Sequence, residues 1–169
     1  MAVQILPALS TGASPLFLRE AEIRRGVELL YFGYSHLTQS ADTILDGQGL
    51  GRAHHRALYF IARQPNLTVS ELLALLAITK QSLGRVITDL TNRGLVESSS
   101  GRIDRRQKLL RLTDAGAALE LTLFEALRDR LSVAYVQAGQ TSVTGFWQVL
   151  EGLIPDSERS RVIGLQAND

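Results

Sequence analysis

Residues 79–116 constrain the fold more than any other stretch, because a helical period is followed directly by a short extended segment. Between Lys80 and Arg93 apolar residues recur every three or four positions, which predicts a helix with one buried side. Gly94 follows, and glycine readily adopts the left-handed conformation that ends a helix. The apolar side carries Leu83, Val86, Ile87 and Leu90, and the opposite side carries Gln81, Arg85, Thr88 and Asn92.

A two-stranded ribbon is predicted after this helix. Its first strand begins at residues 95–97, and residues 98–102 are expected to form the tip, where Gly101 can supply a positive φ. Residues 108–112 return as the second strand, and Thr113 is the expected cap of the next helix. The stretch is therefore expected to place a polar helical surface beside a ribbon.

Positive charge is concentrated on the helix and the ribbon. Residues 80–111 contain eight basic and three acidic residues, an excess of five positive charges, whereas the whole chain has a net charge of +1. A local positive surface attracts phosphates whatever the total charge of the protein. A helix carrying Gln and Arg suits the major groove of DNA, and an arginine-rich ribbon can reach the flanking backbone or minor groove.

The motif across residues 68–116 resembles the DNA-binding core of the MarR (multiple antibiotic resistance regulator) family of winged-helix transcriptional regulators. The family's wing pattern falls on Asp104, Arg106, Leu112-Thr113 and Gly116. The resemblance implies a mainly α fold with a small β-wing, in which a winged helix-turn-helix is joined to long N- and C-terminal dimerisation helices. It also implies a DNA-binding homodimer, most often a repressor. In such a wing Asp104 would orient arginines by ion pairing, while Arg106 or a neighbouring arginine enters the minor groove.

The rest of the chain suits that organisation. Ser14-Pro15 is a good helix start, and Thr68 with Glu71 forms a capping box at the start of another helix. Helices are predicted at residues 51–63 and 69–76, from residue 114 to a break near Gly139, and at residues 142–153. The predicted regions are a flexible arm (1–13), an N-terminal dimerisation helix (14–46), the DNA-binding unit (50–113), C-terminal dimerisation helices (114–154) and a polar tail (155–169).

Composition argues against several other classes of protein. The chain has 45% hydrophobic and 21% charged residues and no cysteine, so a globular protein without disulfides or thiolate metal sites is expected. Neither a membrane span nor a signal peptide is recognisable, and a cytoplasmic location is the default expectation. The three histidines are not spaced as a metal site, and we find no catalytic motif. We therefore expect no enzyme activity, no metal and no cofactor.

The expected DNA contacts follow from the exposed helical side and the wing. Arg85 is the first choice on the helix, followed by Gln81 and Ser82. We expect Arg106→Ala to weaken binding and lower its salt dependence, and Gln81→Ala to alter the sequence preference instead. The complete predicted set is Lys80, Gln81, Ser82, Arg85, Thr88, Arg102, Asp104, Arg105, Arg106 and Lys108.

Aromatic and histidine residues define a second hypothesis. Members of the resembled family often bind small aromatic anions between the dimer-forming helices and the DNA-reading unit, so a small aromatic or anionic effector is a possible partner. The predicted pocket residues are Tyr31, Tyr34, His36, His54, His55 and Tyr59, each of which is equally compatible with a core or dimer-contact role. The alternative for the whole chain is a non-catalytic dimeric interaction protein whose basic hairpin docks an acidic protein partner instead of double-stranded DNA.

Overall fold

The computed structural model describes residues 15–101 and 107–166, and the chain divides into two units, residues 1–36 and 37–169. The first unit contains the 3-10 helix Pro15–Leu18 and the first turns of helix α1, Glu20–Asp46. A helix begins at Pro15, next to the predicted start, but it is a 3-10 helix, and the long helix α1 starts five residues after Pro15, at Glu20. Carboxylates at Glu20 and Glu22 favour that start, since negative charge stabilises a helix N-terminus.

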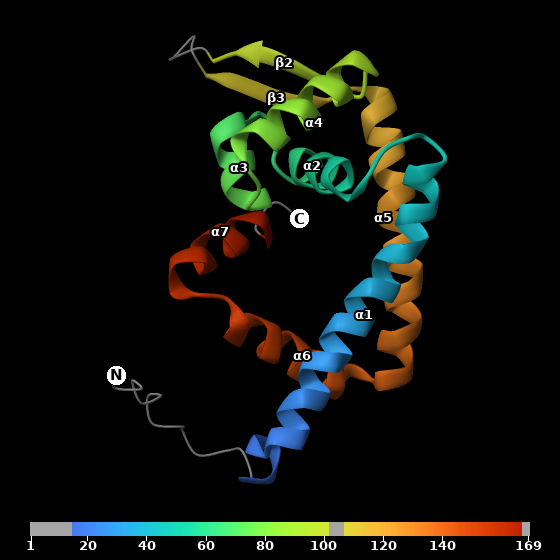
Figure 1. The fold of residues 1–169 in the computed structure, drawn as a ribbon, viewed down its shortest axis with the longest axis vertical. Coiled ribbons are helices and arrows are strands. Elements are labelled where there is room, and N and C mark those ends of the chain that lie inside the picture. The colour runs from blue at the N-terminus through green and yellow to red at the C-terminus, as the bar shows by residue number, and fades with distance from the viewer. Residues whose placement is uncertain (1–14, 102–106, 167–169) are drawn as a thin grey trace. The chain divides into compact units, whose positions relative to one another are not determined.

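The second unit contains the rest of α1, six further helices and three strands among its described residues (Figure 1). The helices are α2 (Arg52–Arg63), α3 (Val69–Leu76), α4 (Lys80–Asn92), α5 (Asp114–Ala138), α6 (Gln140–Leu153) and α7 (Asp156–Gln166). The strands are β1 (Leu67–Thr68), β2 (Val96–Ser100) and β3 (Lys108–Leu112). Mainly α structure with a small β-wing, the predicted fold class, is confirmed.

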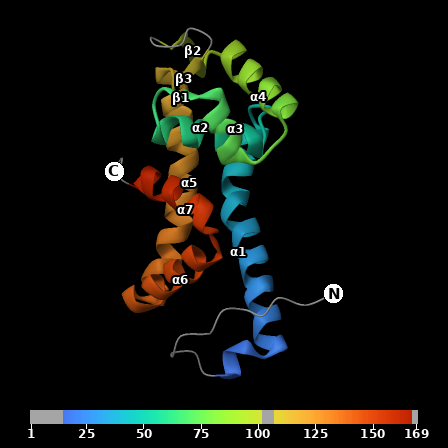
Figure 2. The ribbon, with the colours of Figure 1, turned by 90° about the vertical axis from the view of Figure 1, so that its left-hand side faces the viewer.

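The three strands form an antiparallel sheet in the order β1-β3-β2, beside α4 (Figure 2). The sequence predicted a ribbon of two strands and did not predict β1. This strand has only two residues, too few to show an alternation of apolar and polar side chains. The predicted tip at residues 98–102 also began too early, because Ser98, Ser99 and Ser100 continue β2 opposite Leu110, Leu109 and Lys108. The main chain of Gly101 then donates to the Gln107 carbonyl oxygen over 2.9 Å.

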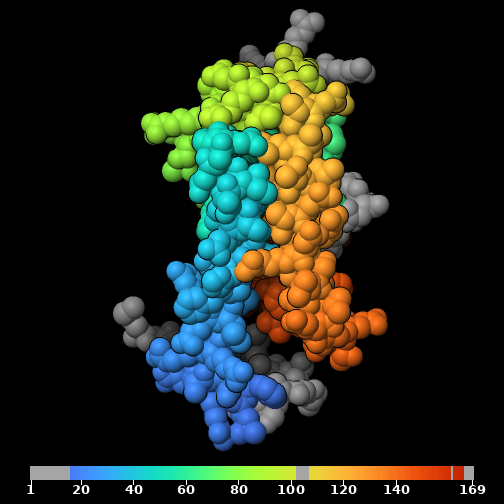
Figure 3. Space-filling model, turned by 90° about the vertical axis from the view of Figure 1, so that its right-hand side faces the viewer, coloured from blue at the N-terminus to red at the C-terminus, as the bar shows by residue number. Residues whose placement is uncertain are grey.

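Helix α2 lies at the centre of the core, where it contacts α3, α4, α5 and β3 (Figure 1). One leucine or more from each surrounding element is excluded from solvent, so the elements share a single apolar core. The side chain of Ser40, in the second unit's part of α1, also donates to the Ala126 carbonyl oxygen of α5, so this end of α1 lies beside α5 (Figure 3). The most buried large residues are Leu45, Leu58, Ile61, Leu67, Leu72, Leu83, Leu90, Leu110 and Leu123.

The capping box predicted at the start of α3 is present. Thr68 Oγ1 accepts a hydrogen bond from the Glu71 main chain over 3.2 Å, and a Glu71 carboxylate oxygen accepts one from the Thr68 main chain over 2.8 Å. Hydrogen bonds from the Thr68 side chain and main chain lower the pKa of Glu71. The helix therefore begins where the two side chains satisfy its free amides.

The polar tail predicted at residues 155–169 contains a helix that the sequence did not predict, because Asp156–Gln166 forms α7. Acidic residues in its first turn, Asp156 and Glu158, favour the helix, and the Arg63 side chain donates to the Leu165 carbonyl oxygen near its end. The helix has almost no amphipathic periodicity, so the apolar pattern gave no signal for it.

Candidate nucleic-acid interface

Helix α4 is oriented by its cap and by a buried apolar stripe. Thr79 Oγ1 accepts from the Ser82 main chain over 3.1 Å, which fixes the first turn. Leu83, Val86 and Leu90 are buried in the core. The opposite side of α4 must therefore face away from the core.

That opposite side is exposed and polar. Lys80, Gln81, Arg85 and Thr88 all have exposed side chains, as the sequence predicted for a surface available to a partner. Ser82 is exposed as well, but its Oγ lies 2.9 Å from Thr79 Oγ1 and takes part in the cap. A shallow groove runs along α4, lined by Gln81, Gly84, Arg85, Thr88, Asp89 and Asn92.

The described part of the wing adds cations beside this surface. Lys108 begins β3 opposite Ser100, and Arg111 lies opposite Glu97; both basic side chains are exposed. The other predicted wing contacts, Arg102, Asp104, Arg105 and Arg106, lie outside the described residues. The expected ion pairing by Asp104 therefore stays a prediction.

Asp89 is the residue of this surface that sequence reasoning missed. It lies on the groove side of α4, where an unpaired carboxylate would repel phosphate. Arg93 Nε donates to Asp89 Oδ1 over 2.9 Å, and this hydrogen bond is the main reason why the pKa of Asp89 is lowered. The helical spacing of four residues was the available signal, since an Asp and an Arg so placed can pair.

The predicted effector residues fall into both units. In the first unit Tyr31 and Tyr34 are 69% and 57% exposed, and His36 is exposed too. In the second unit His54 lies 3.2 Å from an Asp89 carboxylate oxygen, and His55 is buried, with a pKa lowered by that burial although Asp42 raises it. Tyr59 is half-buried and meets Phe60 edge to face. The effector pocket stays a prediction.

Neither a metal-holding group of side chains nor a membrane-spanning helix occurs among the described residues. Within residues 15–101 and 107–166, no three His, Cys, Asp or Glu side chains are grouped so that they could hold a metal ion. No helix in that part of the chain has the length and apolarity needed to cross a membrane.

The chain is similar in sequence and in fold to proteins named as transcriptional regulators. Residues 48–107 match the MarR family model. The chain is 48% identical over 148 residues to the HTH-type transcriptional regulator PetP of Rhodobacter capsulatus, covering 88% of this chain and 89% of PetP.

Two solved structures illustrate the similarity in fold. A mutant MarR from E. coli, complexed with operator DNA, has a TM-score of 0.64 and 22% identity, covering 84% of this chain and all of that one. NadR in complex with 4-hydroxyphenylacetate has a TM-score of 0.65 and 23% identity, covering 88% of this chain and 97% of that one. Together with the capped α4, the three-stranded sheet and the identity to PetP, these findings show that the chain belongs to the MarR family of transcriptional regulators.

Proposed function

We propose that this regulator binds double-stranded DNA as a homodimer, and that α4 reads base edges in the major groove while the wing contacts the flanking backbone. The exposed polar side of α4, held outward by its buried leucines, is the observation that carries the proposal. Gln81 and Arg85 offer the amide and guanidinium groups that pair with adenine and guanine edges. Lys108 offers a charge to phosphate.

Paired cations reduce the repulsion that acidic residues would cause on this surface. Asp89 is the acidic residue among those lining the groove of α4, and its carboxylate already accepts from Arg93. Phosphate approaching α4 therefore meets a neutralised carboxylate together with the exposed side chains of Arg85 and Lys80. A mutant MarR from E. coli, similar in fold, is known in complex with operator DNA, which supports DNA as the partner.

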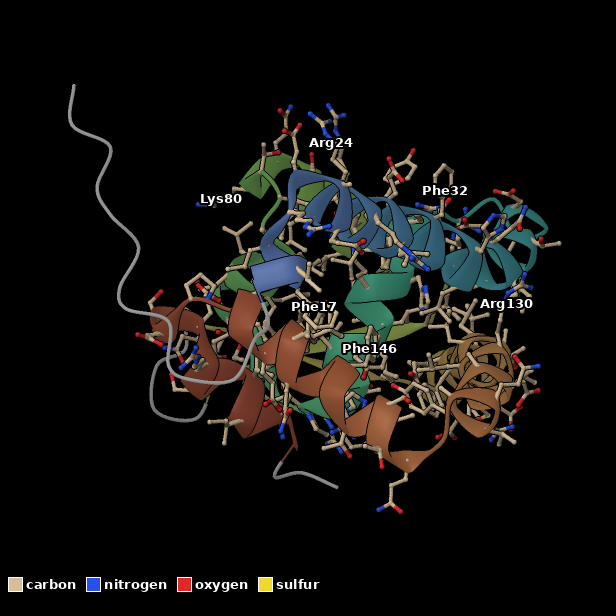
Figure 4. The ribbon with its side chains drawn as sticks, turned by 90° about the horizontal axis from the view of Figure 1, so that it is seen from below. Phe17, Arg24, Phe32, Lys80, Arg130 and Phe146 are labelled. Atoms are coloured by element: carbon tan, nitrogen blue, oxygen red, sulfur yellow. The ribbon has the colours of Figure 1, made fainter. Side chains whose placement is uncertain are left out.

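Exposed apolar side chains supply the physical reason for a homodimer. In the first unit Val27 and Tyr31 of α1 are 62% and 69% exposed, and Phe32 projects outward from the same helix (Figure 4). In the second unit Val136 of α5 is 83% exposed, and α6 has no buried residue among its described positions. Apolar surface of this extent is normally covered by a partner, and two identical chains provide a symmetric one.

The dimer determines the form of the operator. Two identical copies of α4 would meet two half-sites related by a two-fold axis, with centres about 10 base pairs apart. We propose that the protein acts there as a repressor, in line with the resemblance described above. Adding the protein to a transcription reaction from such an operator should lower transcript yield, and a rise in yield would make it an activator.

We further propose that a small aromatic carboxylate releases the protein from DNA. The aromatic and histidine side chains named above supply stacking and hydrogen-bonding groups, and NadR, similar in fold, is known with 4-hydroxyphenylacetate. Calorimetric titration with phenolic acids should show heat of binding, and the same acids should reduce DNA affinity. Absence of both effects would count against these compounds as effectors.

A selection of bound sequences from random duplexes, followed by hydroxyl-radical footprinting, tests the proposed function. We expect an enriched pseudo-palindrome and two protected segments about one helical turn apart on one face of the duplex. Enrichment of a single asymmetric half-site would contradict the homodimer. Absence of enrichment, with binding to an acidic protein instead, would replace the DNA proposal by the interaction-protein alternative.

A further inference from the structure

The last turn of α4 is tied to the turn that joins α1 to α2. Arg93 Nη1 donates to the Gln48 carbonyl oxygen over 2.7 Å, and its Nη2 donates to the Gly49 carbonyl oxygen over 3.4 Å. The Nε of the same guanidinium donates to Asp89, one turn earlier in α4. A single planar side chain thus holds α4 and a loop more than 40 residues away in sequence.

Asp89 extends this connection to the start of α2. Its second carboxylate oxygen lies 3.2 Å from His54 Nε2, while His54 Nδ1 accepts from the Gly51 main chain over 3.1 Å. An accepting Nδ1 carries no proton, so Nε2 carries it and donates to Asp89. The His54 side chain therefore both caps α2 and contacts α4.

The backbone at this corner is shaped for the contact. Gly49 has φ +63°, a conformation that other residues rarely adopt, and a β-carbon there would lie 3.8 Å from Arg93 Nη2. On the other side of the corner, Thr113 Oγ1 donates to the Gly94 carbonyl oxygen over 2.6 Å, just before α5 begins. The end of α4 is thus fixed to the end of α1 and to the starts of α2 and α5.

Arg93 makes more hydrogen bonds than an ordinary ion pair on the protein surface. An exposed Asp–Arg pair within one helix adds little, because water screens it. Here the same guanidinium also satisfies two main-chain carbonyl oxygens of another segment, and such geometry fixes orientation as well as proximity. The contacts therefore define the angle between α4 and the end of α1.

We propose that Arg93 and Asp89 are positioning residues, which set the half-site spacing that the regulator accepts. This inference rests on the proposed homodimer. In such a dimer the distance between the two copies of α4 depends on how each is joined to the long helices. Without the contacts of Arg93 and Asp89, each α4 could change its angle to the long helices. The dimer would then bind half-sites that are closer together or farther apart than the preferred spacing. Neither residue needs to touch a base for this effect.

The test is binding of full-length protein to a series of duplexes whose half-sites are moved together or apart by one or two base pairs. Wild-type protein is expected to prefer one spacing, and Arg93→Met is expected to reduce that preference by about tenfold, the size of a lost charge-assisted hydrogen bond. Asp89→Asn should reduce it less, because its amide oxygen still accepts. Arg128→Met is the matched control, since within the described part of the chain Arg128 pairs inside its own helix, with Glu125 and Asp129.

A second readout separates positioning from direct contact with DNA. The double variant Asp89→Asn/Arg93→Met removes both charges and leaves no unpaired carboxylate on α4. In this variant a positioning pair leaves the dependence of affinity on salt unchanged, whereas loss of a phosphate contact by Arg93 lowers the slope by about one. The inference would be overturned if wild type and Arg93→Met had the same relative affinities across the spacings, or if the double variant had a lower slope. If Arg93→Met does not fold, Arg93→Lys keeps the charge without the planar fork and should still relax the spacing; an unchanged profile in this variant would overturn the inference.

The same series distinguishes this inference from the proposed function. A wild-type protein that shows no preference for paired half-sites would contradict the dimeric regulator itself. A wild-type preference that Arg93→Met retains in full would contradict only the positioning role.

Discussion

Gly116 and Leu95 touch so closely that a β-carbon on Gly116 would lie 1.9 Å from the Leu95 carbonyl oxygen. Leu95 directly precedes β2, and Gly116 is in the first turn of α5, so this contact brings the wing against the long C-terminal helix. Thr113 supports the same approach, since its main chain donates to the Leu95 carbonyl oxygen over 3.1 Å. The Leu-Thr and Gly of the wing pattern are thus explained by packing.

Gly116→Ala should therefore destabilise the protein. The added methyl group cannot fit without moving the backbone of Leu95, so we expect a loss of about 1–3 kcal/mol in the free energy of unfolding, measured by urea denaturation. Gly26→Ala is the control, because a β-carbon there meets no described atom within 4 Å, and it should leave stability equal or higher. Equal stability of Gly116→Ala and wild type would show that the Leu95 backbone can move away from the methyl group at no cost in free energy.

Gly84→Ala should separate stability from DNA binding. Gly84 lies on the groove side of α4, and its added β-carbon would meet no described atom within 4 Å. Alanine should stabilise the helix by about 0.5–1 kcal/mol. The methyl group would stand between α4 and the base edges, so affinity for DNA should fall. A more stable variant with unchanged affinity would mean that this side of α4 does not approach the bases.

Gln81→Ala and Lys108→Ala should weaken binding in different ways. Gln81 offers an amide to a base edge, so its loss should change the preferred sequence at one position, by about 1–3 kcal/mol. Lys108 offers charge to phosphate, so its loss should weaken binding to all sequences and lower the salt slope by about one. Anisotropy titrations on matched and mismatched duplexes measure both effects. If the two variants behaved alike on every duplex, this division of roles would be wrong.

His55 should make the stability depend on pH. Burial lowers the pKa of folded His55 below its ordinary value of 6.5, although Asp42 acts in the opposite direction. The unfolded chain then binds the proton more readily, so stability is complete above pH 6.5 and falls as the pH drops through 6.5 towards the folded pKa. Urea denaturation at a series of pH values should show this decline, and His55→Gln should flatten it. An identical decline in the variant would assign it to other groups.

Local signals made the DNA-reading helix predictable. The apolar period and Gly94 lie within one short stretch, and α4 ends within one residue of the predicted boundary. Periodicity could not find α7 or β1, because the first has little apolar pattern and the second is too short. Such elements depend on distant contacts, such as the hydrogen bond from Arg63 to Leu165.

The candidate site shows the same division between local and distant information. The outward side of α4 follows from helical spacing alone, so the predicted Gln81, Arg85 and Thr88 are exposed as expected. The hydrogen bonds from Arg93 depend on where Gln48 and Gly49 lie in space, and sequence spacing carries no information on those positions. For the same reason the contact of His54 with Asp89 was not predicted, since it crosses from α2 to α4.

The most direct test of the central claim is an anisotropy titration of the protein against its own upstream promoter DNA and a scrambled duplex, each at two salt concentrations. A regulator that reads bases through α4 should bind the promoter more tightly than the scrambled duplex, and both affinities should fall as salt rises. Equal, weak binding to the two duplexes would contradict base reading at that promoter by the surface of α4.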